Sequence, residues 1–185
     1  MESKHVCPWW LGYFLISPVR KWMHNPDKIL GDYIKPGMQA IDYGSAMGYF
    51  SLPMAKKVGN TGKVYCFDIQ GKMLNKLARR AKNAGLENII PRLILSDRNA
   101  FTDLAQTADF ALLFAVAHEV PDQKQLFQEL SGMMKSKALL LFSEPAGHVK
   151  AEEFAQSVSL AENAGFKKLM KLEISRSFAV LFQKS

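Results

Sequence analysis

The stretch AIDYGSAMGYFS, residues 40–51, leads from the end of an apolar strand pattern into the start of an apolar helix pattern. Gly44, Ala46 and Gly48 recur at intervals of two, and Asp42 precedes them. Glycines in such a turn let the backbone approach a ligand closely, so the stretch predicts a phosphate- or nucleoside-binding turn. Ala46 stands where a third glycine would complete the row. Its methyl group costs little if its φ is negative and about 1 kcal/mol or more if its φ is positive.

The rest of the chain alternates strand patterns with helical patterns, which predicts parallel strands joined by crossover helices. Two strand-like segments, 166–177 and 178–184, end the chain with so short a break that they predict an antiparallel hairpin. We expect strands at 38–43, 62–68, 89–97, 108–119 and 137–145 and helices at about 49–58, with its regular part from near Ser51 because of Pro53, and at 73–84, 123–134 and 151–164. The predicted fold class is therefore α/β, a Rossmann-like, doubly wound, seven-stranded and mostly parallel sheet with helices on both faces and a C-terminal antiparallel hairpin. Pro91 cannot donate to a ladder and predicts that its strand is an edge strand or that the proline is among its first residues.

Size and composition narrow the class of protein. A chain of 185 residues with 48% hydrophobic and 22% charged residues fits one globular domain. Two cysteines are too few for a disulfide framework and indicate free thiols in a reducing compartment, so we expect a cytoplasmic protein. The net charge of +7 is spread along the chain and gives no clear indication of nucleic-acid binding.

The N-terminal segment, residues 1–24, is set apart from the predicted main domain, residues 25–185, by its aromatic side chains. It has neither the apolar core and cleavage site of a signal peptide nor the length of a membrane span. Three interpretations stand: a helix packed on the domain or in a dimer contact, a lid over the active site, and a helix on a membrane surface. The aromatic residues are Trp9, Trp10, Tyr13, Phe14 and Trp22.

Polar residues end each predicted parallel strand. Ligands of open parallel sheets bind outside the carboxyl ends of the strands, so a set of polar ends predicts a site there, although strands also leave a core through polar residues by chance. The carboxylate of Asp68 can accept hydrogen bonds from both hydroxyls of a ribose. The polar ends are Asp42, Asp68, Asp97, His118 with Glu119, and Glu144.

The row Asp42, Gly44, Ala46 and Gly48 differs from the G-x-G-x-x-G spacing of dinucleotide-binding proteins. It resembles the first motif of class I S-adenosylmethionine-dependent methyltransferases, D/E-x-G-x-G-x-G, with alanine at one glycine position. The resemblance covers the chain from about Asn25 to its end and includes the closing hairpin. HEVPD at 118–122 and EP at 144–145 look like the small-molecule branch related to quinone-biosynthesis and arsenite methyltransferases.

The resemblance implies S-adenosylmethionine as cofactor and methyl transfer by in-line displacement to a small acceptor. The aromatic N-terminal segment favours an apolar or planar acceptor. Asp42 would order the turn, and Asp68 would bind the ribose. Ile69 and Gln70 would flank the adenine, and Asp97, with Arg98 beside it, would accept from the adenine amino group. Phe114 to Ala117 would form the floor near the sulfonium. Gly44, Ser45, Ala46 and Gly48 would line the methionine part.

His118 is the candidate general base, needed if the accepting atom loses a proton. The alternative is that His118 and Glu119 cap the following helix or hold the loop. Cys7 fits a small buried hydrophobe better than a catalytic thiol, and the four histidines show no spacing typical of a metal site. Two other functions stay open: an NAD(P)-dependent oxidoreductase, and a non-catalytic protein that binds S-adenosylmethionine or a nucleoside. We expect a monomer or a homodimer.

Overall fold

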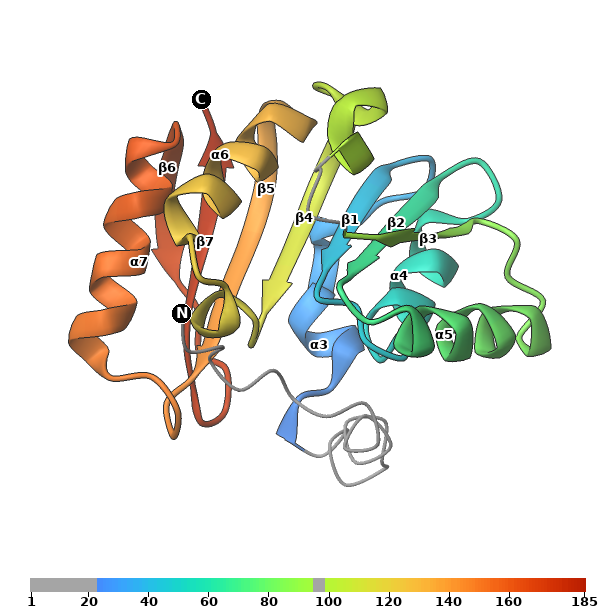
Figure 1. Cartoon of the computed structure of the whole chain (residues 1–185), viewed down its shortest axis with the longest axis horizontal. Helices are drawn as coiled ribbons and strands as arrows, with labels where there is room; N and C mark the ends of the chain where they lie inside the picture. The colour runs from blue at the N-terminus through green and yellow to red at the C-terminus, as the bar shows by residue number, and fades with distance from the viewer. Residues whose placement is uncertain (1–22, 95–98) are drawn as a thin grey trace. The chain divides into compact units, whose positions relative to one another are not determined.

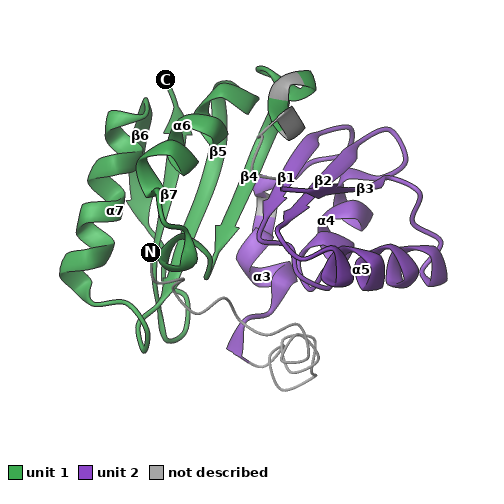
Figure 2. Cartoon of the chain, viewed as in Figure 1, with its two compact units in different colours: residues 1–6, 101–185 green, residues 7–100 purple. Residues whose placement is uncertain are grey.

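The computed structural model describes residues 23–94 and 99–185 of the chain. It divides into two compact units, unit 2 with residues 7–100 and unit 1 with residues 1–6 and 101–185 (Figure 2). Three predicted features lie outside the described residues. They are the aromatic residues of the N-terminal segment together with Cys7, the residue Asp97, and the residue Arg98. Their assignments stay predictions. No helix of the described part is both long enough and apolar enough to cross a membrane.

Unit 2 is built on three parallel strands in the order β3-β2-β1 (Figure 1). The strands are β1 (Gln39–Tyr43), β2 (Lys63–Asp68) and β3 (Ile89–Leu93), and the helices are α3 (Pro26–Leu30), η2 (Gly31–Tyr33), α4 (Ser51–Val58) and α5 (Gly71–Asn83). β3 pairs only with β2 in this unit, which confirms the edge position predicted from Pro91. On α5 the buried residues Met73, Leu74, Leu77 and Ala81 recur at helical spacing, so one face of the helix packs on the strands.

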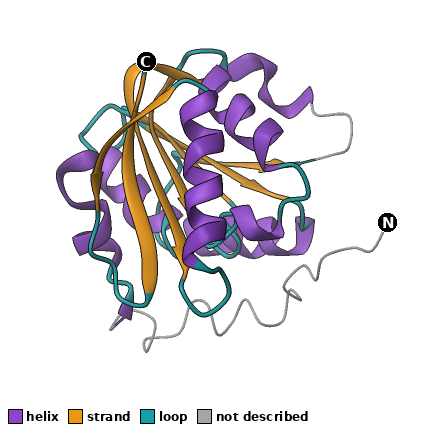
Figure 3. Ribbon diagram, turned by 90° about the vertical axis from the view of Figure 1, so that its left-hand side faces the viewer, coloured by secondary structure: helices purple, strands orange, loops and turns teal. Residues whose placement is uncertain are grey.

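Unit 1 is built on four strands in the order β4-β5-β7-β6. The strands are β4 (Ala108–Phe114), β5 (Met134–Pro145), β6 (Phe166–Lys171) and β7 (Ser177–Lys184). β4 and β5 are parallel, whereas β7 runs antiparallel to both β5 and β6, so the predicted hairpin is confirmed. Its first strand is shorter than predicted, because β6 ends at Lys171 and Ser177 already begins β7. The helical elements, purple in Figure 3, are η4 (Ala117–Glu119), α6 (Gln123–Met133) and α7 (Ala151–Asn163), with η3 (Asn99–Leu104) ahead of β4.

The fourth predicted strand is too long. It ends at Phe114 rather than at residue 119, because Ala115 has a φ of 58°, outside the extended region. The chain leaves β4 there and forms the short helix η4, which contains His118. The side chain at position 118 therefore belongs to a loop that other elements can hold, not to the strand.

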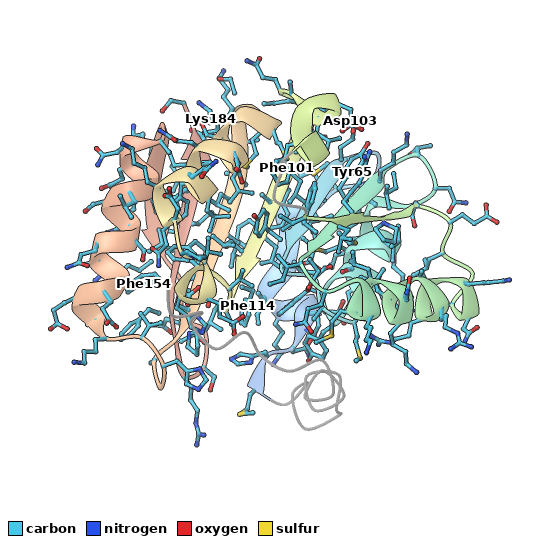
Figure 4. All side chains as sticks on the ribbon, in the orientation of Figure 1. Tyr65, Phe101, Asp103, Phe114, Phe154 and Lys184 are labelled. Atoms are coloured by element: carbon cyan, nitrogen blue, oxygen red, sulfur yellow. The ribbon has the colours of Figure 1, made fainter. Side chains whose placement is uncertain are left out.

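The core of unit 1 contains a run of aromatic rings. Phe142 of β5 lies between Phe127 of α6 and Phe154 of α7, with ring centroids 5.4 and 5.1 Å apart. Phe154, labelled in Figure 4, stacks in turn on Phe178 of β7 at 5.5 Å. Each such pair contributes about 0.5–1.5 kcal/mol beyond the burial of its area, so α6 and α7 are fixed on the carboxyl half of β5 and on β7.

Candidate functional site

The turn after β1 is fixed by the end of β2, within unit 2. The backbone N–H groups of Gly44 and Ser45 both donate to the carbonyl oxygen of Phe67, at 2.8 and 2.9 Å. Gly48 N–H donates to the Ser45 carbonyl at 2.8 Å and closes the turn. The chain thus enters α4 at a set angle, as expected for a ligand-binding turn between a strand and a helix.

Ala46 has a positive φ of 46°. This is the strained alternative of the two that the sequence left open, since the left-handed region costs an L-residue about 1–2 kcal/mol. Its backbone N–H donates to Oδ2 of Asp68 at 2.9 Å, which holds the strained residue in place. The turn is therefore shaped before any ligand reaches it.

Gly48 admits no side chain. Its φ is 80°, and a Cβ atom there would lie 2.7 Å from Cδ1 of Leu52 and 3.0 Å from Cγ of Leu77. Both the backbone conformation and the close packing of α4 and α5 on the turn therefore require glycine at this position.

Asp42 is buried under the turn. Ser51, the first residue of α4, donates its hydroxyl to Oδ2 of Asp42 at 2.5 Å. Burial, and next the charge of Asp42, raise the pKa of the neighbouring Cys66 thiol well above its usual value, while a hydrogen bond with Ser51 lowers it. Asp42 thus links β1 to α4, consistent with its predicted role in ordering the turn, and Cys66 is an inert thiol.

Asp68, at the end of β2, is 8% exposed and accepts backbone hydrogen bonds on both carboxylate oxygens. Ala46 N–H donates to Oδ2, and Gln70 N–H donates to Oδ1 at 2.8 Å. Burial raises the pKa of this carboxyl group, and backbone hydrogen bonds from Gln70, Ala46 and Ile69 offset part of the rise. A carboxylate has about four lone-pair positions, so the group keeps capacity for a hydroxyl donor.

Two further features beside Asp68 fit a nucleoside. Ile69 is 54% exposed and offers an apolar surface directly after the carboxylate. Ser45 is 4% exposed, and its hydroxyl oxygen has no hydrogen-bond partner among the described residues. Buried polar atoms are almost always paired, and Ser45 lies within the glycine turn, so its hydroxyl is a candidate to pair with a bound ligand.

A second cluster lies in unit 1, where β5 ends. Glu144 is 1% exposed, and its Oε1 accepts from the backbone N–H groups of Val116 and Ala117 at 3.1 and 2.8 Å. Its Oε2 is hydrogen-bonded to Nδ1 of His118, whose side chain is 23% exposed. The ring of His148 meets the ring of His118 edge to face at 5.9 Å. A carboxylate paired with one nitrogen of an imidazole is an arrangement suited to proton transfer at the other nitrogen.

The described residues thus bring eight of the predicted site residues together in unit 2 and place two, Phe114 and His118, in unit 1. Phe114 ends β4 and is buried (Figure 4). Sequence reasoning missed the role of Glu144 as the partner of His118, and it missed Arg80 of α5, whose Nη1 donates to the carbonyl oxygen of Met47. The unit 2 residues are Asp42, Gly44, Ser45, Ala46, Gly48, Asp68, Ile69 and Gln70.

Comparison with known proteins places this arrangement in a family. A family model described as a methyltransferase domain matches residues 34–177. Demethylmenaquinone methyltransferase of Bacillus mycoides (strain KBAB4) is 25% identical over 166 residues, which are 90% of this chain and 64% of that protein. The chain thus spans less than two thirds of this relative's length.

Solved structures show the same fold. An S-adenosylmethionine-dependent methyltransferase from Aquifex aeolicus superposes with a TM-score of 0.85 at 24% identity, over 97% of this chain and all of that one. Fibrillarin of Aeropyrum pernix, solved with natively bound S-adenosyl-L-methionine, gives a TM-score of 0.65 at 15% identity over 80% of this chain and 67% of its own. These likenesses confirm the predicted Rossmann-like fold class with its antiparallel closing hairpin.

Proposed function

Because this chain belongs to the methyltransferase domain family, we propose that it transfers a methyl group from S-adenosylmethionine to a small-molecule acceptor. The observation that carries the proposal is the Asp68 carboxylate, which is held by the backbone of the glycine turn through Ala46 and by Gln70. A buried carboxylate with a lone-pair position to spare, next to a turn of small residues, suits a hydroxyl of a ribose.

The cofactor assignment follows the features of the turn. Asp68 binds the ribose, while Ile69 and Gln70 flank the adenine. The Ser45 hydroxyl, buried without a partner among the described residues, pairs with a polar group of the methionine part. Asp97, Arg98 and Phe114 keep the cofactor contacts that the resemblance gives them. The backbone of the turn at Gly44, Ala46 and Gly48 lines the methionine part. Asp42 stabilises the turn by accepting the hydrogen bond of Ser51 at the start of α4.

S-adenosylmethionine supplies a methyl group bound to a sulfonium sulfur, and that sulfur leaves as a neutral thioether when the methyl group is transferred. The chain has to align the acceptor and exclude water. We assign to His118 the removal of a proton from the accepting atom, supported by the bond of its Nδ1 to Glu144, which leaves Nε2 as the proton-accepting nitrogen. The acceptor is accordingly one that loses a proton on methylation.

The acceptor itself is proposed to be apolar or planar. The aromatic N-terminal segment suggested this, and the name of the Bacillus relative, a demethylmenaquinone methyltransferase, is in keeping with it. We also propose a cytoplasmic location and a monomeric or homodimeric state. The aromatic segment is proposed to contact a membrane surface. The oxidoreductase alternative is disfavoured by the family match, and the non-catalytic alternative is distinguished by turnover.

The test is a screen of acceptors, with reduced demethylmenaquinone as the first, that measures formation of S-adenosylhomocysteine. We expect a product with the intact chain. The variant His118→Ala should lower turnover by about 10²–10⁴-fold and leave calorimetric binding of S-adenosylmethionine within a factor of about 3, since none of the cofactor contacts proposed above is made by His118. Unchanged turnover would remove His118 from the mechanism.

A further inference from the structure

Glu144 makes more hydrogen bonds than a simple partner of His118 would need. The backbone N–H groups of Val116 and Ala117 both donate to its Oε1, and the imidazole of His118 bonds to its Oε2. The carboxylate is buried and comes from β5, whereas all three partners come from the loop after β4. One side chain thus fixes both the backbone of this loop and the ring that the loop carries.

The loop is also held without Glu144. Gln123 of α6 donates its side-chain N–H to the carbonyl of Ala117 at 3.0 Å and accepts from the hydroxyl of Ser157, on α7, at 2.7 Å. Ala115, at the start of the loop, has a φ of 58°, and its N–H donates to the Ser143 carbonyl at 2.8 Å. A strained residue persists only where its surroundings over-determine it. The loop backbone therefore has several supports, while the Nδ1 atom of the His118 ring is held by Glu144.

We propose that Glu144 is a positioning residue that sets the tautomer of His118. An ionised carboxylate only accepts hydrogen bonds, so the ring carries its proton on Nδ1 and its lone pair on Nε2. The catalytic consequence of this tautomer rests on the proposed function. With its proton on Nδ1, His118 is in the one neutral form that can take a proton from the acceptor at Nε2.

His118 and the sulfonium account for the proton and the electron pairs of the methyl transfer. His118 Nε2 takes the proton of the accepting atom, which keeps the electron pair of that bond and forms its new bond to the methyl carbon. The electron pair of the broken sulfur–carbon bond stays on sulfur, which becomes a neutral thioether. The positive charge that leaves the sulfonium is carried by the imidazolium of His118, next to the negative charge of Glu144.

The variant Glu144→Gln separates positioning from support of the loop, because the amide has one accepting end. Two backbone N–H groups, those of Val116 and Ala117, require its oxygen, so its NH₂ group must face Nδ1 of His118. The ring then has to accept at Nδ1 and carry its proton on Nε2. The loop keeps both backbone hydrogen bonds, but the ring has the wrong tautomer for accepting a proton.

The test records the ¹⁵N shifts of the His118 ring in the full-length protein at a pH where the imidazole is neutral. We expect Nδ1 to be the protonated nitrogen in the natural chain and Nε2 in Glu144→Gln. The matched control is Ser143→Ala, the preceding residue of β5, whose buried hydroxyl has no hydrogen-bond partner among the described residues. This control should keep the natural tautomer.

Turnover is the second measurement. Formation of S-adenosylhomocysteine with reduced demethylmenaquinone should fall at least about 100-fold in Glu144→Gln, with S-adenosylmethionine affinity unchanged. An unaltered tautomer in Glu144→Gln would overturn the inference, whatever the activity. If the tautomer changes but the natural chain methylates no acceptor, the positioning role stands and the proposed function fails instead.

Discussion

Replacing Ala46 by glycine tests whether the turn is strained before it meets its ligand. Ala46 has a φ of 46°, which costs an L-residue about 1–2 kcal/mol and glycine almost nothing. Glycine also adds conformational freedom to the unfolded chain, which costs about 0.4–1 kcal/mol. At mid-range the relief of strain exceeds this entropic cost, so Ala46→Gly should raise the free energy of unfolding by about 0.8 kcal/mol, within a range of about 0–1.6 kcal/mol.

The measurement is urea denaturation, read as a shift of the midpoint at an unchanged slope. Ala84→Gly is the matched control, because Ala84, at the C-cap of α5, has a φ of −93°. There glycine relieves no strain, so this variant should be less stable than the natural chain by about 0.4–1 kcal/mol. A loss of stability in Ala46→Gly equal to that in Ala84→Gly would refute the reasoning.

The same variant reports on binding. Hydrogen bonds of Gly44 and Ser45 to Phe67, and of Ala46 to Asp68, shape the turn in advance. The strain is then present in both the free and the bound protein and cancels from the affinity. Calorimetry with S-adenosylmethionine should give dissociation constants for Ala46→Gly and the natural chain within a factor of about 3. A tenfold gain, about 1.4 kcal/mol, would mean that the strain arises only on binding.

Two more predictions concern the same unit. Gly48→Ala should lower the free energy of unfolding by about 2–5 kcal/mol, because the new methyl group adds close contacts of 2.7 and 3.0 Å with Leu52 and Leu77 to the strain of a left-handed backbone. The control Gly85→Ala, with a φ of 65° and open space around it, should lose only the strain energy, about 1–2 kcal/mol. Equal losses in the two variants would show that the contacts do not matter. Binding of S-adenosylmethionine should weaken as the pH falls through the raised pKa of Asp68, because the ionised carboxylate accepts a ribose hydroxyl more strongly than the protonated form does, and the loss should begin at a higher pH than an ordinary aspartate would give. In the free protein the sign is opposite: a folded-state pKa above the unfolded one means that Asp68 destabilises the fold as the pH rises through that window. Asp68→Asn should remove this part of the pH dependence, and a pH profile of binding that is the same in Asp68→Asn would contradict the assignment.

The features that the sequence predicts correctly are those written in local patterns. The helical spacing on α5, the apolar runs of the strands and the short break before β7 depend on neighbouring residues. Pro91 predicts an edge strand because it lacks an N–H group, and β3 is an edge of unit 2. The turn with the glycine row contacts the end of β2 at Asp68, as successive strand ends predict, while the binding roles of these residues stay predictions.

The features that it does not predict depend on contacts between distant segments. The positive φ of Ala46 follows from hydrogen bonds to β2, 22 residues away in the case of Asp68. Glu144 and His118 are 26 residues apart, and Arg80 lies 33 residues from its acceptor Met47. The polar strand ends predict that Glu144 and His118 lie at the same edge of the sheet, but no local pattern signals that they pair, or that Arg80 pairs with Met47. Ala115, a residue that favours helices and is tolerated in strands, gives no sign that β4 ends before it.

Calorimetric titration of the natural chain with S-adenosylmethionine, and in parallel with NAD, tests the central claim most directly. The glycine turn, the Asp68 carboxylate and the family match predict saturable binding of S-adenosylmethionine and no comparable heat with NAD. Binding of NAD without binding of S-adenosylmethionine would contradict the account.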